Sequence, residues 1–177
     1  EEFWTNGYAA TSPARLAEAT GVAKGSLYNA FSSKRALFER CLDKYQQQIA
    51  KLAEGLMDHP GSTRECLRDT LRAVVDSDLA QARRRGCLIG NTAVELAGDD
   101  PDLARKIRKM QDESTAWFAR RVERGQREGD VRPDLDATAF AEQMATTLAG
   151  LRVMAVTHEA ESLYRVVDMA LAALQTS

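Results

Sequence analysis

Apolar side chains recur at intervals of three and four residues along most of the chain, which is the spacing of amphipathic helices. The clearest case covers residues 33–56, where one stripe is formed by Leu37, Phe38, Cys41, Leu42, Tyr45, Ile49, Leu52 and Leu56. The chain has only 4 prolines and few β-branched runs, which argues against a sheet. The pattern therefore predicts an all-α protein.

Capping residues place the start of three later helices. Ser62 is followed three residues on by Glu65, which is the spacing of a capping box. Asp100 and Pro101 fit an N-cap and a first helical residue, and Asp136 fits another N-cap. With the turns between them, these signals predict helices over 62–85, 88–97, 101–129, 136–157 and about 160–175.

Residues 13–31, PARLAEATGVAKGSLYNAF, read as two short helices that meet at a turn around Gly21. Gly21 can adopt the positive φ that a tight turn between helices needs. This spacing of a small residue, a glycine and apolar positions is typical of a helix-turn-helix. The inward positions are predicted to be Leu16, Ala17, Val22, Leu27, Ala30 and Phe31.

The outward side of the second short helix carries the candidate DNA contacts, because the N-terminal end of such a helix enters the major groove. Lys24 and Lys34 can neutralise phosphates, and the amide of Asn29 can pair with adenine. Tyr28 is better suited to a phosphate, and Thr11 or Ser12 caps a helix whose first N–H groups can bind one. The predicted set is Thr11, Ser12, Lys24, Gly25, Ser26, Tyr28, Asn29 and Lys34. The alternative is a helical hairpin whose Tyr28 and Asn29 are ordinary solvated surface.

The stretch from Phe3 to Tyr45 resembles the N-terminal domain of the TetR family of regulators. The matching features are Gly7-Tyr8, Thr11-Ser12, Leu16-Ala17, Gly21-Val22, Gly25-Ser26-Leu27-Tyr28, Phe31 and Ser33-Lys34. The resemblance implies a three-helix DNA-binding domain over residues 1–45, with a first helix that begins ahead of residue 1. It implies a ligand-binding and dimerisation domain over residues 46–177. It also implies a repressor of double-stranded operator DNA that a small-molecule effector releases.

A ligand pocket is expected among the middle helices, because pockets combine apolar walls with a few polar groups. Its candidates are Cys87, Asn91, Met110, Trp117, Phe118, Phe140, Met144 and Leu148, with Glu95 and His158 as further polar groups. The same stripe of methionine and aromatic residues fits an ordinary core equally well. Cys87, close to Arg83, Arg84 and Arg85, is either a sensing thiol or a buried core cysteine.

The last two helices are apolar around too much of their circumference for surface helices. In the family that the chain resembles, two such helices pair with their twofold mates, which implies a homodimer. The predicted interface residues are Gly150, Leu151, Met154, Val167, Leu171 and Leu174.

Composition narrows the function classes further. The 3 cysteines are too few for a disulfide scaffold, which favours a reducing cytoplasm. No apolar run approaches the roughly 20 residues that a membrane helix needs, and we expect no membrane partner. No cluster suggests a metal, a cofactor or an enzyme active site, so we expect none of these. The net charge of −2 argues only weakly against DNA binding. The competing hypothesis is a helical small-molecule sensor without productive DNA binding.

Overall fold

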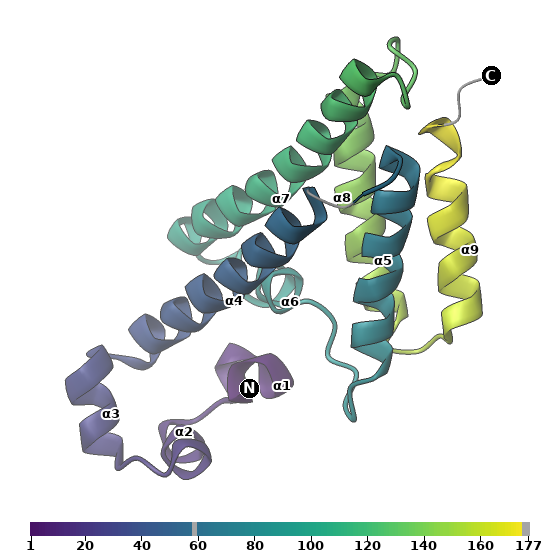
Figure 1. Cartoon of the computed structure of the whole chain (residues 1–177). Helices are drawn as coiled ribbons and strands as arrows, with labels where there is room; N and C mark the ends of the chain where they lie inside the picture. Colours follow the sequence, from purple (N-terminus) through teal and green to yellow (C-terminus); the bar gives the residue numbers. More distant parts are fainter. Residues whose placement is uncertain (58–59, 175–177) are drawn as a thin grey trace.

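The computed structural model describes residues 1–57 and 60–174, and these residues fold into nine α-helices and one short 3-10 helix (Figure 1). The helices are α1 (Glu2–Ala10), α2 (Pro13–Thr20), α3 (Lys24–Phe31), α4 (Lys34–Met57), α5 (Thr63–Leu79), α6 (Leu88–Leu96), α7 (Pro101–Glu128), α8 (Ala137–Met154), α9 (Ala160–Ala170) and the 3-10 helix η1 (Ala172–Leu174). No strand occurs in the described ranges, and the all-α prediction is confirmed.

The predicted helix starts are found where the capping residues placed them. Ser62 and Glu65 form the reciprocal capping box at the start of α5. Asp100 accepts a hydrogen bond from the N–H of Leu103, and Asp136 accepts two at the start of α8. The first helix of the N-terminal unit, expected partly ahead of residue 1, occupies Glu2–Ala10 within this chain.

Three helices end earlier than their apolar patterns predict. α5 ends at Leu79, so Arg83, Arg84 and Arg85 lie in the following loop and not in the last helical turn. α8 ends at Met154, and α9 ends at Ala170 before η1. Arginines of the loop bond distant groups instead, because Arg84 reaches the carbonyl of His158 and Arg85 reaches Glu1. These tertiary contacts are absent from the local pattern that predicted longer helices.

The buried apolar side chains form two separate cores. The first, which we call the N-terminal core, joins α1–α4 to α6 and the start of α7 through Phe3, Leu16, Leu27, Phe38, Leu42, Tyr45, Leu88, Ile89, Leu103, Ile107 and Met110. The second, the C-terminal core, joins α5, α7, α8 and α9. Figure 1 shows α1–α3 at one end, α5 and α7–α9 at the other, and α4 reaching between them. The three-helix unit therefore shares its core with helices of the larger part.

The boundary expected at residue 45 falls inside α4, so one continuous helix belongs to both parts of the chain. Within the described ranges, none of the helices has the length and the apolar character needed to cross a membrane.

Candidate DNA-binding interface

α2 and α3 are held as a helix-turn-helix by local caps and two buried leucines. Ser12 caps α2 by accepting a hydrogen bond from the N–H of Arg15 at 3.2 Å. Gly21 ends α2 in the left-handed conformation, with a φ of 67°, as the turn requires. Leu16 on α2 and Leu27 on α3 are both buried and belong to the N-terminal core. α3 is therefore fixed by its inner face while its other side stays free.

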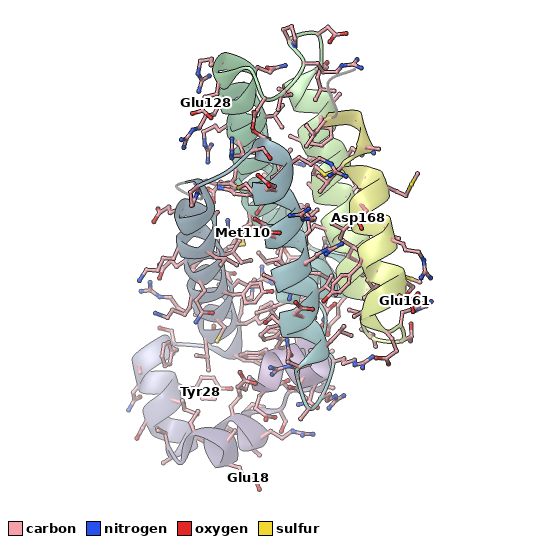
Figure 2. The ribbon with its side chains drawn as sticks, turned by 45° about the vertical axis from the view of Figure 1, so that its right-hand side comes forward. Glu18, Tyr28, Met110, Glu128, Glu161 and Asp168 are labelled. Atoms are coloured by element: carbon pink, nitrogen blue, oxygen red, sulfur yellow. The ribbon has the colours of Figure 1, made fainter. Side chains whose placement is uncertain are left out.

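The first turn of α3 faces solvent. Lys24, Gly25, Ser26 and Asn29 are exposed, and Tyr28 is half-buried. A Cβ added at Gly25 would meet nothing within 4 Å, so no contact inside the protein explains a glycine here. A glycine in a helix costs about 1 kcal/mol relative to alanine, which suits a position that another molecule must approach closely. Figure 2 places Tyr28 on the same end of the molecule as Glu18 of α2.

Three residues of this region lie elsewhere than the sequence predicted. Val22 is 39% exposed and Ala30 is also exposed, so neither belongs to the core between α2 and α3. The short α3 needs only Leu27, with the half-buried Phe31, to seat it. Thr11 is 0% exposed, and its hydroxyl donates to the carbonyl of Gly7 at 2.6 Å. Its side chain cannot reach DNA, and Ser12 alone provides the exposed cap.

The start of α4 lies beside α1 and carries two cations. The ammonium of Lys34 sits 4.3 Å from the centre of the Tyr8 ring and 3.5 Å from the carbonyl oxygen of Ala9. Next to it, Arg35 pairs with Asp100, the N-cap of α7. The hydrogen bond from Arg35, with that from the N–H of Leu103, holds the pKa of Asp100 below its usual 3.8. Lys34 is thus oriented by α1, and α4 is tied to α7.

A carboxylate that the sequence assigned to a ligand pocket instead joins α6 to α1. The two oxygens of Glu95 accept hydrogen bonds from the N–H groups of Tyr8 and Ala9 at 2.9 and 2.8 Å. These N–H groups are unsatisfied within α1 because Gly7 breaks the helix with a φ of 78°. A glycine inside an otherwise helical pattern is the sequence signal for this break. The carboxylate of Glu95 gives no such signal, because it lies 87 residues after Tyr8, whose N–H it accepts.

The residues predicted for a ligand pocket do not line one cavity. Trp117, Phe118, Phe140 and Met144 pack together in the C-terminal core, with Leu148 partly buried against them. The others are spread out: Met110 lies in the N-terminal core, Cys87 is half-buried against that core, Asn91 is exposed and donates to the carbonyl of Arg85, and His158 is exposed. These aromatic and methionine side chains therefore belong to the two apolar cores, which was the alternative interpretation of the sequence.

An open groove of about 410 Å³ lies between α4 and α7. It is lined by Gln46, Ile49, Ala50, Ala53, Glu54, Glu113, Ser114, Trp117 and Arg120. Trp117 is the one predicted pocket residue on this wall, and its indole N–H donates to the carbonyl of Ala53 at 2.7 Å. The Oε1 atom of Gln46 is buried and lacks a hydrogen-bond partner within the described part of the chain. A ligand donor could satisfy this oxygen.

The outer face of α8 and α9 is apolar, but it is not formed by most of the residues predicted for a dimer. Leu151, Val167, Leu171 and Leu174 are at most 2% exposed within a single chain, so they have no surface left for a partner. The exposed positions are Gly150, Val153, Met154, Val166 and Met169. Helical periodicity marked these helices as apolar on two sides but could not tell which side faces the chain's own core.

Comparison with known proteins places both parts of the chain. Residues 1–41 match the family described as bacterial regulatory proteins, tetR family, and residues 63–171 match the tetracyclin repressor-like C-terminal domain. The HTH-type transcriptional repressor ComR of Escherichia coli is 30% identical over 172 residues, covering 95% of this chain and 80% of ComR. An uncharacterized HTH-type transcriptional regulator of Bacillus subtilis, YezE, is 29% identical over 98% of this chain and 91% of its own length.

Solved structures agree with this assignment. A cysteine-substituted variant of the TetR family transcriptional regulator CifR, complexed with 26-base-pair double-strand operator DNA, superposes with a TM-score of 0.88. It is 32% identical in sequence, and the match covers 98% of this chain and 91% of that one.

Proposed function

This chain belongs to the TetR family and is a DNA-binding transcriptional regulator, and from that premise we propose which of its surfaces bind operator DNA, a second copy and an effector. We propose that the DNA-binding surface consists of Ser12, the exposed residues Lys24, Gly25, Ser26 and Asn29, with Tyr28 and Lys34. The observation that carries this proposal is the exposed first turn of α3, including a glycine that no internal contact requires.

Each residue type has a definite role at this surface. Lys24 and Lys34 supply positive charge for phosphates, and the exposed N-cap of α2 at Ser12 offers backbone N–H groups to another phosphate. Asn29 lies one turn further along α3, where its amide can read a base edge. The same exposed turn favours DNA binding over a sensor without DNA contacts, and the protein then works in the cytoplasm beside its operator.

Salt dependence tests this surface directly. Removing one phosphate contact reduces the slope of log affinity against log salt concentration by about 1. Lys24→Ala should therefore weaken operator binding and flatten this slope, measured by fluorescence anisotropy of a labelled duplex between about 50 and 200 mM salt, a range over which phosphate contacts change the affinity by orders of magnitude. Lys51→Ala, an exposed lysine near the far end of α4, is the matched control and should leave the slope unchanged. Equal slopes for wild type and Lys24→Ala would remove α3 from the DNA surface.

The partner for the outer face of α8 and α9 is a second copy of the chain. Val153, Val166 and Met169 are 67%, 48% and 75% exposed, which is an unusual concentration of large apolar side chains on two adjacent helices. A twofold dimer through this face would present two copies of α3 about one turn of DNA, or a multiple of it, apart.

The effector site is the groove between α4 and α7. The lining carries Glu54, Glu113 and the Gln46 oxygen beside Arg120, which favours a polar ligand with hydrogen-bond donors on an apolar body that covers Trp117. α4 carries both this wall and Lys34, so a ligand that shifts α4 also shifts the DNA-binding end. A ligand can release the operator only if it binds the released state more tightly.

Two tryptophan substitutions on α4 test this groove. Compounds that release the wild-type protein from operator DNA should fail to release Ala50→Trp, in which the new side chain fills the groove. The same compounds should still release Gln48→Trp, because residue 48 lies outside the groove.

A further inference from the structure

The guanidinium of Arg152 on α8 forms hydrogen bonds with three other segments of the chain: α5, α4 and the loop that contains Gly86. Its Nε and Nη2 atoms donate to the carboxylate of Asp78 on α5, both at 2.8 Å. Nη1 donates to the hydroxyl of Tyr45 on α4 at 2.7 Å, and Nη2 also donates to the carbonyl of Gly86 at 3.0 Å. The side chains of Asp78 and Arg152 are 2% and 12% exposed, so this is a buried ion pair with its donors satisfied.

The carbonyl of Gly86 connects this cluster to α1. It accepts a second hydrogen bond, at 3.0 Å, from the indole N–H of Trp4. Trp4 also packs edge-on against the ring of Tyr45, with centroids 5.1 Å apart, and the guanidinium carbon of Arg85 lies 4.3 Å from the centre of the Trp4 ring. Trp4 and Arg152 therefore share one acceptor and one aromatic neighbour, although they lie on the first helix and on α8.

Close packing at Gly86 and the protonation states of Arg152 and Tyr45 both maintain the contacts of this cluster. Gly86 has a φ of 65°, and a Cβ at this position would lie 3.3 Å from the carbonyl oxygen of Arg152. Burial is the largest single influence on the pKa of Arg152 and lowers it, but the hydrogen bond to Asp78 and the electrostatic effects of Tyr45, Cys87 and Asp78 together raise the pKa above its ordinary value, so the guanidinium stays charged. Burial raises the pKa of Tyr45, so its hydroxyl stays protonated and donates to the Sγ atom of Cys87.

We propose that Arg152 is a positioning residue for operator binding, which fixes the orientation of α1, and with it α2 and α3, relative to α8 through Gly86 and Trp4. The next two residues of α8, Val153 and Met154, lie on the exposed apolar face assigned to the dimer. The cluster thus joins the face that sets the distance between two protomers to the helix that carries the DNA-binding unit. This inference rests on the proposed DNA surface and dimer.

The test removes selected hydrogen bonds of the cluster and keeps a positive charge beside Asp78, because deleting Arg152 outright would leave a buried carboxylate without its counter-ion and unfold the region. Trp4→Phe deletes the indole N–H and keeps an aromatic ring, and Tyr45→Phe deletes only the hydroxyl. Arg152→Lys keeps the charge beside Asp78 but loses the fork that reaches Gly86 and Tyr45. The matched control is Tyr164→Phe, which deletes a hydroxyl hydrogen bond between α9 and α5, to Asp76, as Tyr45→Phe does within the cluster.

All variants are compared as full-length protein by thermal unfolding, light scattering and operator anisotropy, well below their midpoints of unfolding. We expect Trp4→Phe to weaken operator binding about fivefold to tenfold, as the loss of one hydrogen bond allows. Tyr45→Phe and Arg152→Lys each lose at least two hydrogen bonds of the cluster and should weaken operator binding at least as much. Trp4→Phe combined with Arg152→Lys should weaken it less than the product of the two, because both act through the carbonyl of Gly86. Tyr164→Phe should leave operator affinity unchanged, whatever its effect on the melting temperature.

The inference is overturned if the three variants bind the operator within twofold of wild type, as Tyr164→Phe should, even where they lose thermal stability. In that case the Arg152 cluster is structural only. A failure of the proposed function looks different, because then the wild-type protein would not bind operator or Lys24→Ala would keep the full salt slope.

Discussion

Gly7 and Glu95 show how a single residue can fix the relation between two distant parts of the chain. The φ of Gly7 is 78°, and a Cβ at this position would lie 2.8 Å from Oε2 of Glu95. Two constraints therefore coincide at one glycine: a left-handed backbone, and space already occupied by the carboxylate that caps the rest of α1.

Substitution by alanine separates these two constraints. Gly21 has a similar φ of 67° but open space around it, so Gly21→Ala should cost only the backbone strain of about 1–2 kcal/mol. Gly7→Ala should lower the free energy of unfolding more than this, because the Glu95 carboxylate must also move. Urea unfolding of both variants measures the difference. Equal losses would mean that Glu95 gives way freely and does not hold α1.

The sequence could identify the exposed residues of α3 because the helix-turn-helix is a local pattern of about twenty residues. It misplaced Thr11 and Val22 because burial at the edges of such a motif depends on neighbours elsewhere in the fold. The role of Glu95 could not be predicted, since its partners are the N–H groups of Tyr8 and Ala9, far away in the sequence.

Among the helices, starts were predicted better than ends, and the reason is physical. An N-cap such as Asp100 or Asp136 acts on the N–H groups of its own first turn, so the signal is local. The end of α5 at Leu79 is followed by a loop whose arginines bond other elements, and no local pattern records these partners. The same limit applies to α8 and α9, where periodicity could not separate the core side from the exposed side.

The link between α4 and α7 predicts a dependence of stability on pH. Because the pKa of Asp100 is lowered in the folded protein, its stabilising effect is present above the usual value of 3.8 and is lost as the pH falls through the lower folded value. Asp100→Asn keeps an N-cap acceptor but loses the charge facing Arg35. Its free energy of unfolding should be lower than wild type at pH 7, and the difference should shrink towards pH 3.

Urea unfolding at the two pH values checks this prediction. Asp134→Asn alters another carboxylate paired with an arginine, Arg132, but on an exposed segment, and should change stability little at either pH. A deficit in Asp100→Asn that is as large at pH 3 as at pH 7 would show that the cap geometry, and not the charge, was lost.

At the scale of the whole molecule, α4 and the N-terminal core both connect α1–α3 to the larger C-terminal part of the chain. α4 runs from Lys34 to the groove wall, and the N-terminal core includes residues of α6 and α7. The DNA-binding unit is thus part of a continuous packed body, which allows events at the groove or at the α8–α9 face to reach α3. Figure 2 shows the separation involved, with Tyr28 at one end and Asp168 on the side of α9.

The proposed dimer through α8 and α9 presents two copies of α3 to operator DNA, and one pair of variants can test this arrangement. Val153→Glu places a charge on the proposed dimer face, whereas Val94→Glu places it on α6 at a position that is 91% exposed. Light scattering and operator anisotropy are measured on both. We predict that Val94→Glu remains a dimer and binds the operator like wild type, while Val153→Glu is a monomer and loses at least tenfold in affinity, because one α3 then binds alone. A Val153→Glu protein that stays dimeric would show that the dimer forms elsewhere, and one that binds the operator as tightly as wild type would show that operator binding does not need this dimer.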